Sequence, residues 1–289
     1  MKPRIAFQGE LGANSHIACA ETRPDLEPMP CATFEDVFQA AATGEAELAM
    51  IPVENSIAGR VADIHHLLPT SPLSILAEHF MPIRFQLMAP KGAQLDGIRT
   101  ARSHIMALGQ CRNFLRQHGI LARTTADTAG AAREVAEEGD PAVAAIAPAM
   151  AAEVYGLDIL ARDIEDAAHN TTRFVIMGRD PEPFEKDDPA GAEGWVTAFV
   201  FRVRNVPSAL YKALGGFATN GVNMTKLESY QVGGAFSATQ FYSEVEGHPE
   251  DPALMRALDE LSFFSSEIKH LGVFPAHPYR KTAARLAGG

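Results

Sequence analysis

Short apolar runs alternate with segments of helical spacing over the first two thirds of the chain. The runs RIAFQ at residues 4–8, ELAMIPV at 47–53 and RFVIMG at 173–178 have the length and apolar content of buried strands. In the segment 105–119, Leu108, Cys111 and Leu115 fall on one helical face. Alternation of strands and helices predicts parallel sheet covered by helices, with ligands at the carboxyl ends of the strands.

The other elements expected before Arg179 follow from the same patterns. Helices are expected over residues 15–23, 34–43, 127–138 and 149–156, and from Ser56 to a point before Pro69. Strands are expected over residues 74–80, 83–90, 122–126 and 142–148.

A change of composition after Arg179 divides the chain. Residues 180–193 hold three prolines and a cluster of acids, which predicts a linker between a first domain, 1–179, and a second domain, 194–275. The second domain has the order strand, helix, strand, strand, helix, strand, which is the ferredoxin-like βαββαβ unit. Because this unit is small, a sheet edge paired between two copies would stabilise it. The basic residues 276–289 are expected to form a flexible tail.

Composition narrows the class of protein. The formal net charge of -11 argues against a nucleic-acid partner, because phosphate neutralisation needs a basic surface. The three cysteines, Cys19, Cys31 and Cys111, lie far apart, which argues against a disulfide framework or a cysteine-rich zinc site and is typical of a reducing compartment. Since no signal peptide or membrane-spanning run is evident, we expect a cytoplasmic protein without membrane contact.

Three serines, Ser15, Ser56 and Ser103, are expected to stand where a strand gives way to a helix. Each can cap the free amides of its helix, and each helix N-terminus carries about half a positive charge. Because strand-to-helix loops emerge at one edge of a parallel sheet, these three termini, with Glu54 and Asn55 beside them, are candidates for one anion-binding site. The alternative is that each serine only caps its helix.

The segment HNTTRF at residues 169–174 is the most specific candidate for chemistry. Arg173 offers a planar cation for a carboxylate, and the Thr172 hydroxyl can donate to an oxygen that gains negative charge. The alternative makes Arg173 an ion-pair partner and Thr172 an ordinary strand residue. The sequence has no dinucleotide, nucleoside triphosphate, serine hydrolase or zinc motif, so neither a cofactor nor a metal is expected.

The segments GELGANSHIACA, IPVENSIAGRV, SHIMALGQC and HNTTRF, in this order and spacing, resemble the four signature regions of the prephenate dehydratase family. In the second domain, ALYKAL and NMTKLES are similar to the ACT domain that this family carries. The resemblance covers residues 4–274. It implies a two-lobed α/β catalytic domain like type II periplasmic binding proteins, followed by the ACT domain, in a homodimer or homotetramer formed through both.

The resemblance also implies a lyase that converts prephenate to phenylpyruvate in phenylalanine biosynthesis. Loss of carbon dioxide and water makes the ring aromatic, so the substrate supplies the driving force and no cofactor is needed. Thr172 then corresponds to the catalytic threonine, and Arg173 holds a carboxylate. The role of Glu54 stays open, because a carboxylate repels a dianionic substrate unless it is protonated or turned away. The residues that the resemblance places around the substrate are Ser15, Asn55, Ser56, Ser103, Asn170 and Phe174.

A phenylalanine site in the second domain is the last implication of the resemblance. Ser208 replaces a family glycine, and Tyr230 and Gln231 replace the usual arginine and proline, so inhibition, activation and a purely dimerising role stay open. Arogenate is the alternative substrate, and a non-catalytic effector-binding protein is the alternative class. The positions that match the phenylalanine pattern are Ala209, Leu210, Asn223, Met224 and Glu228.

Overall fold

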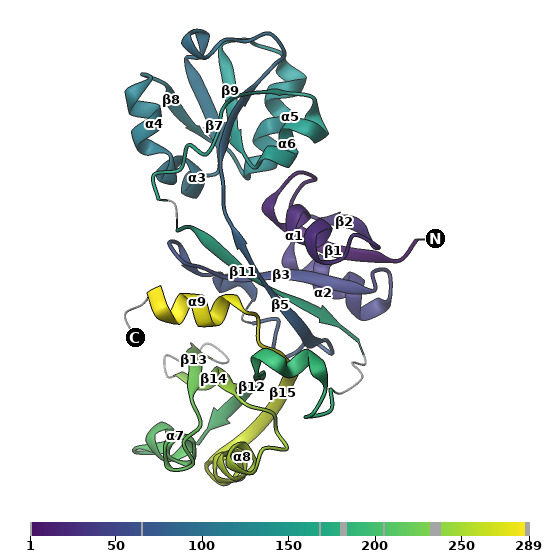
Figure 1. The fold of residues 1–289 in the computed structure, drawn as a ribbon, viewed down its shortest axis with the longest axis vertical. Helices are drawn as coiled ribbons and strands as arrows, with labels where there is room; N and C mark the ends of the chain where they lie inside the picture. Colours follow the sequence, from purple (N-terminus) through teal and green to yellow (C-terminus); the bar gives the residue numbers. More distant parts are fainter. Residues whose placement is uncertain are drawn as a thin grey trace. The chain divides into compact units, whose positions relative to one another are not determined.

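The computed structural model describes residues 2–64, 66–167, 169–179, 184–204, 206–231 and 238–286 (Figure 1). The chain divides into two compact units. One unit comprises Met1–Ala62 and His79–Phe174, and the other comprises Asp63–Glu78 and Val175–Gly289. The domain boundaries expected at residues 179 and 194 stay predictions.

The N-terminal sheet holds the strand in which HNTTRF ends. Its order is β2-β1-β3-β11-β5, with β4 paired to β3, and β1 is parallel to both β2 and β3. The division between the units falls within β5 and β11. The strands are β1 (Arg4–Gln8), β2 (Glu27–Cys31), β3 (Leu48–Asn55), β4 (Gly59–Arg60), β5 (Ser74–Pro82) and β11 (Thr171–Gly178).

Two helices, α1 (Asn14–Thr22) and α2 (Phe34–Thr43), connect the first three strands. Helix α2 begins with a capping box, in which the Thr33 hydroxyl accepts from the Asp36 amide and the Asp36 carboxylate accepts from the Thr33 amide, both at 3.1 Å. It ends at Gly44, whose φ of 87° is a left-handed conformation that glycine adopts easily. The helix predicted over residues 34–43 is therefore confirmed.

The second sheet has the order β10-β6-β9-β7-β8. Strand β7 is parallel to β8 and β9, whereas β6 is antiparallel to β9 and β10. The parallel sheet that was expected is therefore mixed here, because β6 runs antiparallel to both of its neighbours. The elements are β6 (Gln86–Ala89), η2 (Leu95–Gly97), β7 (Thr100–Ser103), α3 (Ile105–Gln110), α4 (Arg112–Gln117), β8 (Leu121–Thr124), α5 (Thr128–Glu138), β9 (Val143–Ala147), α6 (Ala149–Tyr155) and β10 (Asp158–Ala161).

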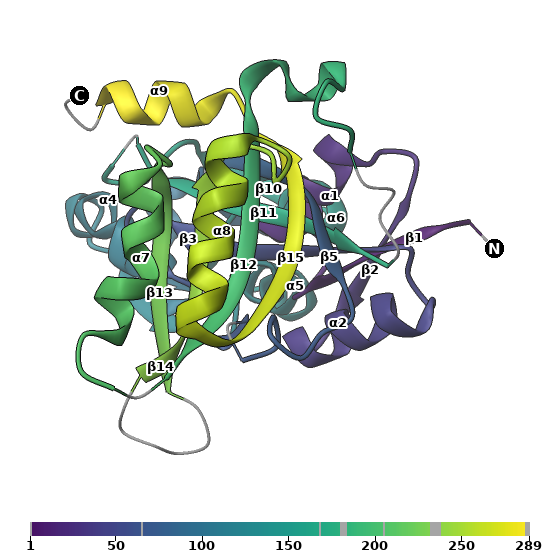
Figure 2. The same cartoon turned by 90° about the horizontal axis from the view of Figure 1, so that it is seen from below.

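The third sheet has the order β13-β14-β12-β15 and antiparallel pairs throughout. This order confirms the predicted ferredoxin-like βαββαβ unit. Helices α7 and α8 lie side by side over one face of the sheet (Figure 2), and a core rich in phenylalanine fills the space between them and the strands. The elements are β12 (Trp195–Val203), α7 (Ala209–Thr219), β13 (Met224–Gln231), β14 (Ala238–Glu246), α8 (Pro252–Phe264) and β15 (Ser265–Pro275).

The predicted linker has local structure in its described part, residues 184–193. The Trp195 indole donates to the carbonyl of Lys186 at 3.0 Å, and the Lys186 ammonium lies 2.6 Å from the Asp251 carboxylate. A short 3-10 helix, η3 (Pro189–Glu193), leads into β12. The remaining residues of the predicted linker, 180–183, lie outside the described residues.

The helix expected to begin at Ser56 is wrong. Strand β3 ends at Asn55, whose side-chain oxygen accepts hydrogen bonds from two backbone amides just after it, at 3.0 and 2.8 Å. This side chain sets a turn, and Gly59, with φ of 82°, leads the chain back along β3 as β4. Between β4 and β5, the helical structure in the described residues is one short 3-10 helix, η1 (Ala62–Ile64).

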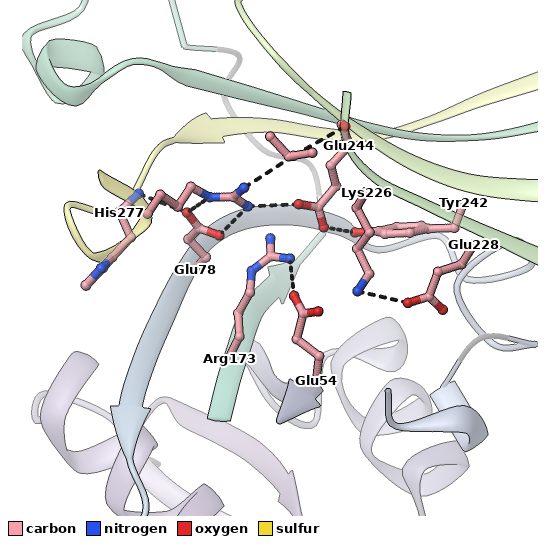
Figure 3. Close-up of polar contacts among 10 residues, drawn as sticks. Glu54, Glu78, Arg173, Lys226, Glu228, Tyr242, Glu244 and His277 are labelled. Atoms are coloured by element: carbon pink, nitrogen blue, oxygen red, sulfur yellow. Dashed lines mark hydrogen bonds and ion pairs between the residues drawn. The ribbon is translucent and has the colours of Figure 1, made fainter. Parts of the chain in front are cut away.

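The basic tail also differs from the flexible segment that was expected, because its described part forms helix α9 (Tyr279–Leu286). Arg280 donates from Nε and Nη2 to the Glu78 carboxylate at 2.6 and 2.8 Å, and Nη2 also donates to Glu244 at 2.8 Å (Figure 3). The side chains of Glu78 and Glu244 are 0% and 1% exposed. Tyr242 donates its hydroxyl to Glu244 at 2.5 Å. Charge-assisted hydrogen bonds to buried carboxylates therefore anchor the helix.

Ser208 has a backbone conformation that glycine adopts more easily. Its φ is 61°, directly before α7, and the left-handed region costs an L-residue about 1–2 kcal/mol. We therefore expect Ser208→Gly to raise the free energy of unfolding by about 1 kcal/mol in urea denaturation. Ser229→Gly, within strand β13, is the matched control and should lower it. Equal changes in both variants would contradict strain at Ser208.

Candidate active site

Thr172 belongs to a chain of hydrogen-bonded side chains from three elements. Asn55 donates from Nδ2 to Thr172 Oγ1 at 2.9 Å and to Asn170 Oδ1 at 2.7 Å. Asn170 is 1% exposed and donates in turn to Gln110 Oε1, at the end of α3, at 2.6 Å. Because Asn55 Oδ1 accepts two backbone amides, the orientation of its side-chain amide is set by the fold.

The Thr172 hydroxyl hydrogen is available to a ligand. Both amide hydrogens of Asn55 are donated, so the Thr172 oxygen is the acceptor in their contact. In the part of the chain that the structure describes, the Thr172 hydroxyl has no hydrogen-bond acceptor of its own, and the residue is only half-buried. Accepting one hydrogen bond polarises a hydroxyl and strengthens it as a donor. Thr172 can therefore stabilise negative charge on a ligand oxygen.

Ser56 holds the start of β11 in place. Its hydroxyl donates to the His169 carbonyl and accepts from the Thr171 amide, both at 2.9 Å, and its amide donates to the Thr171 carbonyl at 2.8 Å. The hydroxyl thus already has one acceptor and one donor in the backbone of HNTTRF. Ser56 was expected to contact the substrate, and in this structure it positions the segment that carries Thr172.

Arg173 points to the other face of the sheet. Successive side chains of a strand lie on opposite faces, and Thr172 shares the face of Asn55. Arg173 pairs with Glu54, at 3.1 Å between Nη1 and Oε1 (Figure 3). Its guanidinium lies 5.8 Å from the centre of the Phe80 ring. It is 3% exposed. The structure thus shows Arg173 as an ion-pair partner. Thr172 and Arg173 were expected to bind one ligand together, but in this structure their side chains lie on opposite faces of β11.

The expected convergence of three serine-capped helices is also wrong. The cap of α1 is Ala13, without a side-chain hydrogen bond, and Ser15 lies inside the helix. Ser103 ends β7 and donates its buried hydroxyl to the Ile146 carbonyl at 2.6 Å, while His104 caps α3. The structure therefore places Ser103 in the core rather than at a helix start.

Phe174 is the remaining residue predicted to contact the substrate. Its side chain is 1% exposed and lies on the interior part of β11. The structure therefore brings together Asn55, Asn170 and Thr172, places Ser56 behind them, and keeps Phe174 in the core. The roles of all these residues toward a substrate stay predictions.

His16, in the first turn of α1, is a residue that the sequence patterns did not single out. Its Nδ1 accepts the Gly12 amide at 2.9 Å, and its ring stacks on Phe7 with 5.6 Å between centres. Gly12 has φ of 88°, and a Cβ there would lie 2.7 Å from the Cα of Ala151, so the loop packs closely against α6. In the sequence, the spacing of four residues between Gly12 and His16, across the start of a helix, was the signal that could have indicated this contact.

Protonation of His16 should weaken this loop. Burial lowers the pKa of the His16 imidazole, because the charged form loses hydration. The neutral ring accepts the Gly12 amide, whereas the imidazolium has no free lone pair. The stabilisation is therefore present above the ordinary histidine pKa of about 6.5 and is lost as the pH falls through the lowered folded-state value.

We expect His16→Gln to lower the free energy of unfolding by about 0.5–1.5 kcal/mol at pH 8. The difference from the wild type should shrink as the pH falls to about 5, because the wild type then loses the same hydrogen bond. Urea denaturation of both proteins at several pH values measures this difference. A difference that does not change with pH would contradict the neutral-ring contact.

The residues predicted for phenylalanine binding lie in the third-sheet domain. Ala209 belongs to the buried core of this domain, and Leu210 and Met224 pack against that core. Asn223 accepts the Glu246 amide with its backbone carbonyl at 3.0 Å. Glu228 forms an ion pair with Lys226 at 2.9 Å (Figure 3). The structure thus joins three of the five residues through one core, and their part in ligand binding stays a prediction.

The thiols are poorly suited to nucleophilic chemistry. Burial raises the pKa of Cys19 to about 12 and also raises the pKa of Cys111, so both stay protonated near neutral pH. Within the described residues, no group of three or more His, Cys, Asp or Glu side chains is arranged to hold a metal ion. None of the helices in the same residues combines the length and apolar character needed to cross a bilayer.

The chain has a mixed α/β fold that matches solved prephenate dehydratases. The structure of prephenate dehydratase from Arthrobacter aurescens in complex with L-Phe superposes with a TM-score of 0.86 at 27% identity, covering 98% of each chain. The sequence profile of the family described as prephenate dehydratase matches residues 5–182. This chain belongs to the prephenate dehydratase family.

Relatives whose names give other activities align with nearly the whole chain. A protein of Komagataeibacter europaeus named bifunctional N-acyl-homoserine lactone acylase/prephenate dehydratase is 51% identical over 96% of this chain and 97% of its own. A solved structure described as GqqA, a novel type of quorum quenching acylase, has a TM-score of 0.89 at 51% identity, covering 96% of this chain and 99% of its own. Arogenate dehydratase/prephenate dehydratase 1 of Arabidopsis thaliana is 36% identical over 95% of this chain and 72% of its own.

Proposed function

We propose that this protein catalyses the decarboxylative dehydration of prephenate to phenylpyruvate. The observation that carries the proposal is the Thr172 hydroxyl, which accepts a hydrogen bond from a fixed Asn55 amide and keeps its own hydrogen for a ligand. Membership of the family supplies the substrate class. The partly exposed position of Thr172 makes it accessible to a substrate.

The reaction needs a donor at the departing oxygen. The bond from the ring to its carboxylate breaks and releases carbon dioxide, its electron pair enters the ring, and the hydroxyl para to it leaves. That oxygen gains negative charge in the transition state and takes a proton to become water. Thr172 donates a hydrogen bond to this oxygen and relays the proton from solvent, while Asn55 holds the threonine in orientation.

Arg173 and Glu54 act at a distance from the substrate in this proposal. Their ion pair lies on the opposite face and joins β11 to β3, the two strands that carry Thr172 and Asn55. The pair therefore fixes the separation of the two side chains that meet on the catalytic face. A Glu54 carboxylate near the substrate would repel its negative charge. In this proposal Glu54 is turned to the other face and paired with Arg173, so this repulsion is avoided.

Regulation by phenylalanine is a further part of the proposal. The Arthrobacter aurescens relative was solved with L-Phe bound, and the third-sheet domain has the ferredoxin-like order. We infer that Ala209, Leu210, Asn223, Met224 and Glu228 contribute to such a site where two copies of this domain pair, in a cytoplasmic homodimer or homotetramer. Binding would couple to catalysis by about 1–3 kcal/mol, which is normal for linked sites.

Acylase activity is the second candidate. It is favoured by 51% identity over 96% of the chain to a protein whose name gives both activities. Such a reaction adds water across an amide bond, giving a carboxylic acid and homoserine lactone. A hydroxyl donor such as Thr172 can also stabilise the oxyanion of amide hydrolysis, so the two activities have to be separated by assay.

The test is a product assay with three substrates. We expect the purified protein to form phenylpyruvate from prephenate, and parallel reactions with arogenate and an N-acyl-homoserine lactone measure the alternatives. Phenylalanine, added over a concentration range, should change the rate, and Asn223→Ala should weaken its effect without changing the basal rate. A folded protein that forms no phenylpyruvate from prephenate would overturn the proposal.

A further inference from the structure

A cavity lies beside the hydrogen-bond chain of Thr172, within the same unit. It has a volume of about 670 Å³, which is in the range of small-molecule sites, and it is formed by α3, α4, β8 and the turn after β3. Apolar side chains dominate its wall, among them Ile57, Met106 and Leu115. Ile57 and Met106 are 40% and 45% exposed, so the fold leaves large apolar groups uncovered there.

Two arginines give this cavity a positive charge. Arg112 and Arg116 line it from α4, and no carboxylate belongs to its wall. In the described part of the chain neither guanidinium has an ion-pair partner, and the Asp166 carboxylate, outside the cavity wall, accepts the backbone amide of Arg112 at 3.1 Å. Cations four residues apart on one helix repel each other, so helix stability does not explain the pair. In a protein of formal net charge -11, a cavity with two cations and no acid favours an anionic ligand.

The cavity adjoins the hydrogen-bond chain of Thr172 at two points. Gln110, which lines it, accepts the hydrogen bond of Asn170 at 2.6 Å. Ile57, on the other side, donates its amide to Asn55 Oδ1 at 3.0 Å. One residue on each side, Gln110 and Ile57, therefore belongs to the cavity wall and also contacts the network.

We propose that this cavity binds an unbranched aliphatic chain that carries a carboxylate, as in a medium-chain fatty acid. The apolar wall takes the hydrocarbon chain, and Arg112 and Arg116 bind the carboxylate. A medium-chain fatty acid is neither the substrate nor the product of the dehydration, so this site goes beyond that reaction. It does not depend on that reaction being correct.

Calorimetric titration with hexanoate, octanoate and decanoate, below their micelle concentrations, tests the proposal. Affinity should rise about fourfold for each buried methylene. Decanoyl-homoserine lactone, with the same chain and no charge, should bind at least tenfold more weakly than decanoate. Equal binding of the two would show that the head group is not recognised and would overturn the role of the arginines.

Matched variants locate the ligand. Met106→Gln and Arg116→Gln should each weaken decanoate binding at least tenfold, and Arg116→Lys should retain most of it. Met255→Gln, at a methionine of similar exposure on α8, and Arg123→Gln, at an exposed arginine outside the cavity, should leave it unchanged. Absence of binding by the folded wild type, or affinity independent of chain length, would overturn the site. Neither result depends on turnover of prephenate.

Discussion

Replacement of Thr172 by valine is expected to lower kcat for phenylpyruvate formation by about 10²–10³, which corresponds to about 2.7–4 kcal/mol of lost transition-state stabilisation. Valine keeps the shape of threonine and removes the donor, so KM should change little. Thr172→Ser keeps the hydroxyl and should retain most of the activity. Steady-state kinetics with prephenate measures all three proteins.

Thr171→Val is the control for the valine substitution. Thr171 is the neighbouring threonine on the opposite face of β11, and it is 8% exposed. An isosteric change there tests the strand without touching the donor that faces Asn55. If Thr171→Val loses as much kcat as Thr172→Val, the loss reports damage to β11, and the donor role of Thr172 is wrong.

Removal of the Arg280 guanidinium is expected to destabilise the protein by about 3–5 kcal/mol, because its loss leaves buried carboxylates without this counter-charge. Glu78 and Glu244 are 0% and 1% exposed, and both accept hydrogen bonds from Arg280. Arg280→Met keeps much of the volume of the side chain. Urea denaturation of the variant and the wild type, followed by circular dichroism, measures the difference.

Two further variants separate burial of charge from loss of packing. The double variant with Glu78→Gln and Arg280→Met should recover part of the stability, since one of the buried carboxylates is then neutral. Lys281→Met removes a cation from an exposed ion pair with Glu193 and should change stability by less than about 1 kcal/mol. A double variant as unstable as the sum of its single variants would contradict the charge argument.

The spacing of apolar residues predicted those helices and strands whose starts and ends are set by neighbouring residues in the sequence. The helix over residues 34–43 has a capping box at its start and a glycine at its end, and both are visible in the sequence. The third sheet was predicted from apolar runs and helical segments in one fixed order, and the order β13-β14-β12-β15 confirms it. In these segments the local preference and the tertiary packing agree.

Elements that depend on a single side chain or a distant partner were missed. Asn55 turns the chain into a hairpin through its own hydrogen bonds, whereas the sequence predicts a helix that begins at Ser56. Arg280 lies in a segment with the composition of a flexible tail, but Glu78, which binds it, is 202 residues away. The pairing of Arg173 with Glu54 likewise needs the sheet order, because a motif does not show which faces its neighbours take.

The alternation of Thr172 and Arg173 across β11 means that two adjacent residues of one motif are held by different contacts. Under the proposed function, a substitution library scored for growth without phenylalanine would find both positions intolerant and would suggest one shared role. The same library scored for protein abundance would separate them, since changes at Thr172 leave the buried ion pair of Arg173 and Glu54 intact, whereas changes at Arg173 do not. Comparing the two scores would therefore distinguish a motif position that serves the reaction from one that serves folding.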